Sequence, residues 1–427
     1  MKVAVVSPDA AGLAKSVAAP DLETTTFGVP FYSGGWGVAL VREWVADRLE
    51  MDLLAEAPDA LVFEAETPAE LAGIIIAAVR LNLPAACVVP PKGVFTATIA
   101  ALGFTPLDDG VGLSELVRGA VEEKGLRARR LVDSFSLANA LRVALSLGSG
   151  SETFVHLAAI GREADVVGFP RMARVLTPET PAVTRPGSGW YAENGLPGIL
   201  DHLGDALRDV KTISGTLKSY VVEASERPGE EYSHDFVTAR TSGSEVLCRV
   251  PVGVEEISGR CRVFDSEAAA IEGLQKVLEA PENSDNSEES ADAGDHEEDP
   301  VVFVVRGYGP SAVPGLAVLD ELARSIESLG LSDRVSVLTD GLAPDGAPGS
   351  WASMFSPEAA SGGVIGRLTN DDLLKIDLAE GRILTSVTTE DISLRRTFRK
   401  TPQKSLSVYA KRYAKNNLTA IEGATFG

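Results

Sequence analysis

Short apolar runs alternate with longer helical stretches along the first half of the chain. The apolar runs predict three buried strands, and the stretches between them predict helices at residues 37–49 and 68–81. The strands are expected at residues 3–6, 60–63 and 86–89. Strands that are apolar on both faces and alternate with helices indicate a parallel α/β sheet.

The hydrophobic pattern changes near residue 212. Before it, further helices are expected, the last with Ser151 as its N-cap, at 113–123, 136–147 and 151–163. After it, turn residues separate short alternating stretches, at 245–250, 262–264, 301–305, 335–338, 374–378 and 383–387. This predicts an α/β fold of two domains: a parallel-sheet α/β domain over residues 1–212 and a mostly β, barrel-like domain over residues 213–427.

Two charged segments stand apart from this pattern. Residues 281–300 hold nine acids, no base and no large apolar side chain, which predicts a disordered acidic insertion in the second domain, with an acidic tether as the alternative. Residues 395–415 hold eight bases and no acid, with Tyr409 and Tyr413 among them. We interpret them as a helix that packs back onto an acidic body, in preference to a nucleic-acid-binding face.

Composition narrows the class of protein. The 427 residues are 44% hydrophobic, so the chain is long and apolar enough for two or three packed domains. Its net charge of −22 argues against a general nucleic-acid or anionic-membrane binder, and with 12 lysines it indicates adaptation to high salt (a halophilic protein). Three cysteines exclude a disulfide scaffold, and no targeting segment or membrane span is expected. We expect a cytoplasmic protein.

Four motifs in the second half follow one another in a specific order. A turn rich in small residues, 309–315, follows the expected strand at 301–305 and precedes a helical pattern. After it come Thr339-Asp340-Gly341, the segment 355–363 and Ile376-Asp377-Leu378. This ordered set resembles the C-terminal domain of the dihydroxy-acid dehydratase/phosphogluconate dehydratase family.

The resemblance extends upstream, to about residue 25. It includes the segments 259–269, 147–157, 77–85 and 93–97. The resemblance implies an α/β domain followed by a β-barrel-type domain, and a dimer. It also implies the removal of water from a 2,3-dihydroxy acid or sugar acid to give a 2-keto acid. Family members use an iron–sulfur cluster on three cysteines, a divalent metal held by carboxylates and a modified lysine, and a serine base.

At the family's chemical positions, this sequence departs from the pattern. No cysteine precedes Cys87. The remaining positions carry residues that are poor ligands or bases: Phe31, Thr67, Pro68, Ala69, Pro91, Tyr308, Val318 and Pro344. We therefore expect neither the cluster nor the divalent metal, and we assign no catalytic residue. Cys87 is interpreted as a small hydrophobic residue of a buried strand, and His156 as a core histidine.

Other polar positions of the motifs are kept, and they are our candidates for binding a ligand in the cleft. Glu64 and Glu66 follow an expected parallel strand, at the end where α/β folds place ligands. The second-half candidates are Gly309, Pro310, Asp340, Gly341, Ser356 and Glu358. Three of these, Asp340, Ser356 and Glu358, also suit turns and a helix start, which favours a retained scaffold over retained catalysis.

Three hypotheses follow. The first is a family member without catalysis that acts as a partner subunit, in a homodimer or a heteromer with an active paralogue, or binds a small organic acid between the domains. The second is an active hydro-lyase with altered ligands, such as a cation held by Glu64, Glu66 and Asp340. The third is a structural protein that keeps the fold for oligomerisation.

Overall fold

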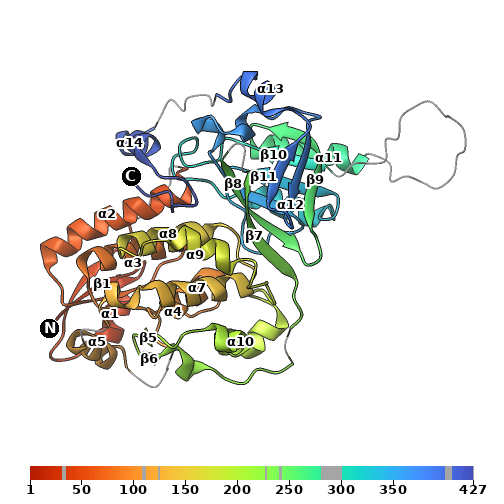
Figure 1. Ribbon diagram of the computed structural model, residues 1–427. Coiled ribbons are helices and arrows are strands. Elements are labelled where there is room, and N and C mark those ends of the chain that lie inside the picture. The colour runs from red at the N-terminus through yellow and green to blue at the C-terminus, as the bar shows by residue number, and fades with distance from the viewer. Residues whose placement is uncertain are drawn as a thin grey trace, which may run out of the picture.

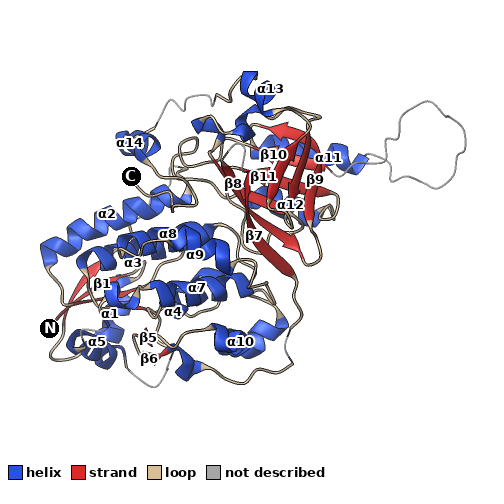
Figure 2. Ribbon diagram, in the orientation of Figure 1, coloured by secondary structure: helices blue, strands red, loops and turns tan. Residues whose placement is uncertain are grey.

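The structure is a computed structural model. It describes residues 1–30, 35–107, 112–123, 126–226, 228–239, 243–279, 301–399 and 406–426. Helices dominate the first half of the chain and a large sheet dominates the second (Figure 2). This arrangement confirms the predicted mixed α/β class, with a parallel sheet first and a barrel-like sheet second.

The N-terminal sheet has four strands in the order β2-β1-β3-β4, and every neighbouring pair is parallel. Its strands are β1 Lys2–Val6, β2 Glu23–Phe27, β3 Ala60–Phe63 and β4 Ala85–Cys87. Both central strands are buried, as their apolar composition predicts. The prediction omitted β2, an edge strand whose three consecutive threonines give no apolar signal.

Helices surround this sheet (Figure 1). They are α1 Ala10–Val17, α2 Val38–Glu56, α3 Pro68–Leu81, α4 Val94–Ala101, α5 Leu113–Glu122, α6 Ala128–Leu131, α7 Ser134–Ser146, α8 Glu152–Glu163 and α9 Phe169–Leu176. The closest helix pair is α2 and α3. A Cβ at Gly73 would lie 2.7 Å from the Arg42 carbonyl oxygen, so only glycine allows this approach.

A further helix and a small hairpin complete the first half. Helix α10 (Gly189–Leu203) contains Gly195 and Pro197, and the chain kinks there. The hairpin pairs β5 (Lys211–Thr212) with β6 (Gly215–Thr216). Short 3₁₀ helices lie at Gly204–Ala206 and Leu217–Tyr220.

The second sheet has eight strands in the order β14-β13-β9-β10-β11-β12-β8-β7. Strands β9 to β12 are parallel, and the outer strands on both sides are antiparallel. The edge strands β14 and β7 approach each other, so the sheet is nearly closed. The strands are β7 Tyr232–Ala239, β8 Ser244–Pro251, β9 Glu256–Phe264, β10 Val301–Val305, β11 Val335–Thr339, β12 Trp351–Ser356, β13 Leu373–Asp377 and β14 Arg382–Thr385.

Helices connect and flank these strands. They are α11 Glu267–Glu279, α12 Asp320–Ser328, α13 Thr389–Leu394 and α14 Val408–Asn416, with 3₁₀ helices at Ala359–Ser361 and Val364–Arg367. The predicted helix in the basic stretch 395–415 is correct only for its end: α14 begins at Val408, and residues 395–399 are not helical. The predicted acidic insertion, 281–300, lies outside the described residues.

The two sheets are joined through helix ends and turns. The first N–H groups of α2 donate to the turn 314–316, with the Ala39 N–H 2.7 Å from the Gly315 carbonyl oxygen. Ser151 stands at the predicted N-cap of α8, but its hydroxyl accepts from the Ala343 N–H, 2.8 Å away, instead of capping the helix. The boundary at residue 212 stays a prediction.

The C-terminal end of the chain lies beside α2 (Figure 1). Buried Arg42 donates to the carbonyl oxygens of Gly423 and Ala424. Helix α14 packs there as well: the Tyr409 hydroxyl lies 2.7 Å from an Asp47 carboxylate oxygen, and Tyr413 is buried. The tyrosines of the basic stretch are thus part of the packing. In the described ranges, no helix has the length and apolar character that a membrane crossing needs.

Candidate functional site

Most of the candidate residues lie where the parallel strands β10, β11 and β12 end. There, side chains of the turn after β10, the end of β11 and the segment after β12 surround a cavity of about 350 Å³, closed on its far side by α14 and the residues after it. Candidate residues Pro310, Asp340, Ser356 and Glu358 line it. We call it the β11–β12 cavity. The carboxyl ends of parallel strands are the usual place for ligands in such sheets.

Asp340 holds the loops of this cavity together. Its Oδ1 accepts from the Tyr308 N–H at 2.9 Å, and its Oδ2 from the N–H groups of Gly307 at 3.2 Å and Ala359 at 2.9 Å. The side chain is 1% exposed. Burial raises the pKa of Asp340, and the backbone N–H groups oppose that rise. Its bonds to two separate loops give the residue a structural reason to be present.

Glu358 makes a second clamp across the cavity. Its carboxylate accepts from the Ser311 N–H at 3.0 Å and 3.2 Å, and from the Ser361 hydroxyl at 3.3 Å. Burial raises the pKa of Glu358, and the nearby Asp340 carboxylate adds to the rise. Gly309 is required for this contact, because a Cβ there would lie 2.2 Å from Glu358 Oε2.

The remaining wall of the cavity comes from the C-terminal part of the chain. The hydroxyl of Ser311 lies 3.3 Å from the Asn417 side-chain amide, which links the β10 turn to the end of α14. Lys415 of α14 is the cation among the lining residues in the described part of the chain, and Thr419 adds a hydroxyl. The sequence gives no signal for Lys415, Asn417 or Thr419 as lining residues, because no motif surrounds them.

Glu64 and Glu66 lie elsewhere, at the end of β3 in the N-terminal sheet. Glu64 accepts from the Ser7 hydroxyl at 2.6 Å, and Glu66 is exposed. Neither lines the β11–β12 cavity, which is formed by the second half of the chain alone. In the described ranges, no three His, Cys, Asp or Glu side chains are grouped so that they could hold a metal ion. The structure therefore does not bring Glu64, Glu66 and Asp340 together as a cation site.

The N-terminal positions that match the family's ligands are engaged in local structure. Thr67 is the N-cap of α3: its hydroxyl accepts from the Glu70 N–H, and the Glu70 carboxylate accepts from the Thr67 N–H. Pro68 is the first residue of that helix. The carbonyl oxygen of Pro91 accepts from the Tyr191 hydroxyl at 2.5 Å. Phe31 lies outside the described residues.

The matching positions in the second half are engaged in the same way. The Tyr308 hydroxyl accepts from the Glu267 N–H at 2.7 Å. Val318 forms a β-bridge with Leu342 and packs against the core. The Pro344 backbone abuts Gly150, where a Cβ would lie 2.4 Å from the Pro344 carbonyl oxygen.

The three cysteines do not fit a cluster site. They lie on β4, β8 and β9, and each is a buried free thiol. Burial raises the pKa of Cys87 and of Cys261 to about 12, and raises that of Cys248 further. An iron–sulfur cluster needs several cysteine sulfurs around one site, whereas Cys87 lies in the N-terminal sheet and Cys248 and Cys261 lie on separate strands of the second sheet. The donor set of this chain therefore does not fit the family's cluster.

His156 is a core residue, as predicted. It is fully buried in α8, with Nδ1 3.3 Å from an Arg42 nitrogen and Nε2 3.3 Å from the Glu152 carboxylate. Burial lowers the pKa of His156 well below its ordinary value, and the Arg42 charge contributes. The imidazole is thus neutral and bonded within the fold.

Comparison with known proteins agrees with the resemblance in the sequence. A family model described as dihydroxy-acid/6-phosphogluconate dehydratase C-terminal matches residues 247–424. A dihydroxy-acid dehydratase of Aquifex aeolicus (strain VF5) is 30% identical over 341 residues, which cover 72% of this chain and 58% of that protein. One from Methanococcoides burtonii is 30% identical over 328 residues, 70% of this chain and 56% of the relative.

A third relative is covered more fully. A dihydroxy-acid dehydratase of Clostridium botulinum (strain Alaska E43 / Type E3) is 25% identical, with 90% of this chain and 83% of that protein aligned. The chain spans less than three-fifths of the length of the first two relatives. The match to the family model covers β10, β11, β12 and α14, the elements that form the β11–β12 cavity. The chain therefore belongs to the dihydroxy-acid/6-phosphogluconate dehydratase family.

Proposed function

We propose that this chain no longer catalyses the removal of water from a dihydroxy acid, the reaction after which its relatives are named. Instead, it binds a small organic acid in the β11–β12 cavity. One observation carries the proposal. Residues that serve the local structure stand at the described positions that match the family's ligands and base. Thr67 caps α3, the Pro91 carbonyl oxygen accepts a hydrogen bond, and the Pro344 backbone packs against Gly150. Such residues supply no thiolate, carboxylate or base.

The cavity has groups that suit a hydroxylated acid. Lys415 supplies a positive charge for a carboxylate, and the hydroxyls of Ser311, Ser356 and Thr419 can bond to sugar-like hydroxyl groups. The charges of Asp340 and Glu358 are directed at backbone N–H groups, so they oppose an anionic ligand less than exposed carboxylates would. A volume of about 350 Å³ is within the range of small-molecule sites.

The first test is chemical. The full chain, purified without oxygen, is assayed for iron and acid-labile sulfide and then incubated with a panel of dihydroxy and sugar acids. We expect iron and sulfide far below stoichiometric amounts and no 2-keto acid. A stoichiometric cluster, or keto-acid formation at a rate above that of the buffer, would show the proposal to be wrong and would support the alternative of an active hydro-lyase.

The second test is binding. Calorimetric titration with the same acids is compared between wild type, Lys415→Gln and Lys411→Gln. Both lysines are exposed on α14, but only Lys415 lines the cavity. Loss of one charge-assisted hydrogen bond of about 1.5–3 kcal/mol predicts at least about tenfold weaker binding for Lys415→Gln. Lys411→Gln should bind like wild type, and equal weakening in both variants would contradict a specific site.

Assembly belongs to the same proposal. We propose that the chain forms a homodimer, or a heteromer with an active member of its family in the cytoplasm. Light scattering on the purified chain measures its mass in solution, and co-expression with an active family member tests the heteromer. A monomer in the first experiment and no co-purification in the second would contradict a partner role.

A further inference from the structure

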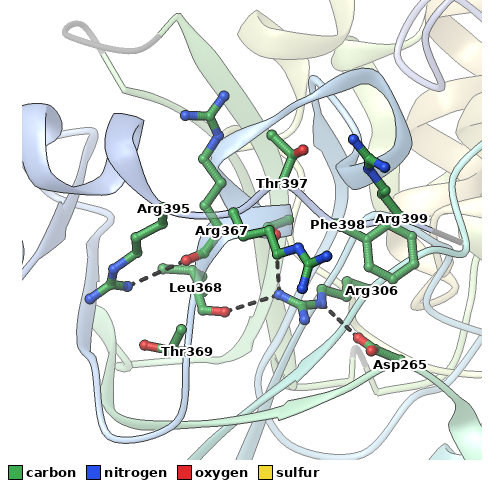
Figure 3. A pocket seen from close by; sticks show the side chains of 11 residues that line it. Asp265, Arg306, Arg367, Leu368, Thr369, Arg395, Thr397, Phe398 and Arg399 are labelled. Carbon is green, nitrogen blue, oxygen red and sulfur yellow. Dashed lines mark hydrogen bonds and ion pairs between the residues drawn. The ribbon is translucent and has the colours of Figure 1, made fainter.

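A second hollow lies beside the ends of β9 and β10, and arginines dominate it (Figure 3). It encloses about 580 Å³ and is lined by the residue after β9, the residue after β10, the segment 366–369 and the segment 395–399. Its five arginines are Arg306, Arg367, Arg395, Arg396 and Arg399. We call it the arginine cleft. None of its residues lines the β11–β12 cavity.

Three of the arginines are fixed in place by bonds to the fold. Arg306 donates to Asp265 at 2.7 Å and to the backbone carbonyl oxygens of Gly366 at 3.2 Å and Leu368 at 3.0 Å. Its guanidinium lies 5.3 Å from the centre of the Phe398 ring. Figure 3 shows these bonds converging on Arg306. A guanidinium held in this way needs little ordering when an anion binds.

Arg395 and Arg367 are also held in place by hydrogen bonds to the fold. Arg395 bonds both oxygens of Asp372, at 2.5 Å and 2.9 Å, and donates to the Arg367 carbonyl oxygen. The Arg367 guanidinium donates to the Ser393 carbonyl oxygen at 2.6 Å, while its Nε–H is buried without an acceptor. Arg367 is therefore anchored by backbone, with no carboxylate partner in the described residues.

The charges around the cleft do not balance. The carboxylates of Asp265 and Asp372 offset two of the five guanidinium groups. Arg367, Arg396 and Arg399 form no ion pair within the described residues, although the whole chain carries a net charge of −22. Clustered like charges repel one another, so this arrangement is unfavourable until a counter-charge arrives.

Another hollow, of about 370 Å³, adjoins the arginine cleft and offers space for a part of the ligand beyond its charged group. It shares Asp265, Arg306, Leu368 and Thr369 with the arginine cleft and continues along Val263 and Phe264. We infer that the arginine cleft binds a small anion with at least two negative charges, such as a phosphate ester or a polycarboxylate. The guanidinium forks match the oxygens of either group, and the adjoining hollow takes the carbon skeleton.

The inference does not depend on the proposed function, and a separate titration tests it. The full chain is titrated calorimetrically with pyrophosphate, inorganic phosphate, citrate, acetate and a short oligonucleotide at one fixed ionic strength. We expect saturable binding of one pyrophosphate or citrate per chain, at least about tenfold tighter than inorganic phosphate, because the additional charged group of these probes forms further charge-assisted hydrogen bonds with the guanidinium groups. Acetate should give no measurable heat. Pyrophosphate in preference to citrate identifies a phosphate site, and the reverse a polycarboxylate site.

The variants are chosen to leave the fold intact. Arg396 and Arg399 are exposed and make no bonds to the described fold, so the double variant R396Q/R399Q should keep the wild-type melting temperature and bind pyrophosphate at least about tenfold more weakly. The control, R130Q/R162Q, removes two exposed arginines from α6 and α8 in the first half. It should bind like wild type.

Four outcomes would overturn the inference. They are no saturable binding of either multivalent probe, wild-type affinity in R396Q/R399Q, equal weakening in the R130Q/R162Q control, and an oligonucleotide that binds more tightly than pyrophosphate. The last would identify the cleft as part of a nucleic-acid surface, whose affinity falls steeply with added salt.

Discussion

The buried guanidinium of Arg42 offers the sharpest test of how the chain is held together. Arg42 is fully buried in α2 and bonds its neighbour Glu43 at 2.9 Å and 3.1 Å. It also donates to Val155 of α8 at 3.2 Å and to Gly423 and Ala424, at 2.6 Å and 3.3 Å. One side chain thus ties α2 to α8 and to the C-terminal segment.

Replacing Arg42 with methionine keeps much of the volume and removes every one of these bonds. Glu43, which is 1% exposed, is then left with Arg80 at 3.9 Å as its remaining cation in the described structure. Removing one partner of a buried ion pair costs about 3–5 kcal/mol. We therefore expect R42M to lose about 4 kcal/mol of unfolding free energy, and R42M/E43Q to recover at least about half of that loss because no charge stays unpaired.

Urea unfolding followed by tryptophan fluorescence measures the difference. The matched control is R48M on the same helix, where Arg48 is 55% exposed and pairs with Asp52; such a surface pair contributes less than about 1 kcal/mol.

Burial already raises the pKa of Glu43, and loss of Arg42 raises it further. Because a raised carboxyl pKa favours the folded state at low pH, the R42M loss should be smaller at pH 5 than at pH 8. A loss no larger than that of R48M would refute the reasoning.

Two further predictions concern buried carboxyl groups. Asp340→Asn replaces a carboxylate oxygen by an N–H donor that faces backbone N–H groups, so we expect a loss of about 3 kcal/mol in urea unfolding, while the exposed control Asp333→Asn loses almost none. Burial raises the pKa of Glu152 from 4.5 to about 7, so the stability from its protonation is present below pH 4.5 and is lost as the pH rises through 7. Glu152→Gln should therefore show a smaller fall in melting temperature between pH 6 and 8 than wild type; an identical fall in both proteins would contradict the assignment.

Much of the fold could be predicted because most strands are apolar on the faces that they bury. The runs at β1, β3, β10 and β11 are continuous or nearly continuous apolar segments, and all four were predicted. Strand β7 was not predicted, because its sequence YSHDFVTA places His234 and Asp235 in the middle of the strand. The burial of His234 becomes favourable only once its Nε2 lies 3.0 Å from the Ser149 carbonyl oxygen, a contact that no local pattern reveals.

The candidate site could be predicted only in part. Pro310, Asp340, Ser356 and Glu358 lie at or just after the ends of the neighbouring parallel strands β10, β11 and β12, so their order along the chain also places them together in space. Glu64 follows a strand of a different sheet, and its position in the sequence does not say which sheet ends face each other.

The arginine cleft could not be predicted from the sequence, because its residues come from separate segments of the chain. The basic stretch after residue 395 is visible in the sequence, but Arg306 and Arg367, which complete the cleft, come from a strand end and a 3₁₀ helix far away in the chain. A charge pattern along the sequence shows which charged residues are close in the chain, but not which distant segments meet in space. The convergence of these three segments is a property of the fold.

The two hollows are linked by the short segment that follows β10. Arg306 lines the arginine cleft, and the next residue, Gly307, donates its N–H to Asp340. Gly307 also lies against Phe398, since a Cβ there would be 2.5 Å from the ring. Asp340 thus fixes the backbone on which both hollows depend, and a carboxylate with this role would be retained whether or not the chain kept any catalysis.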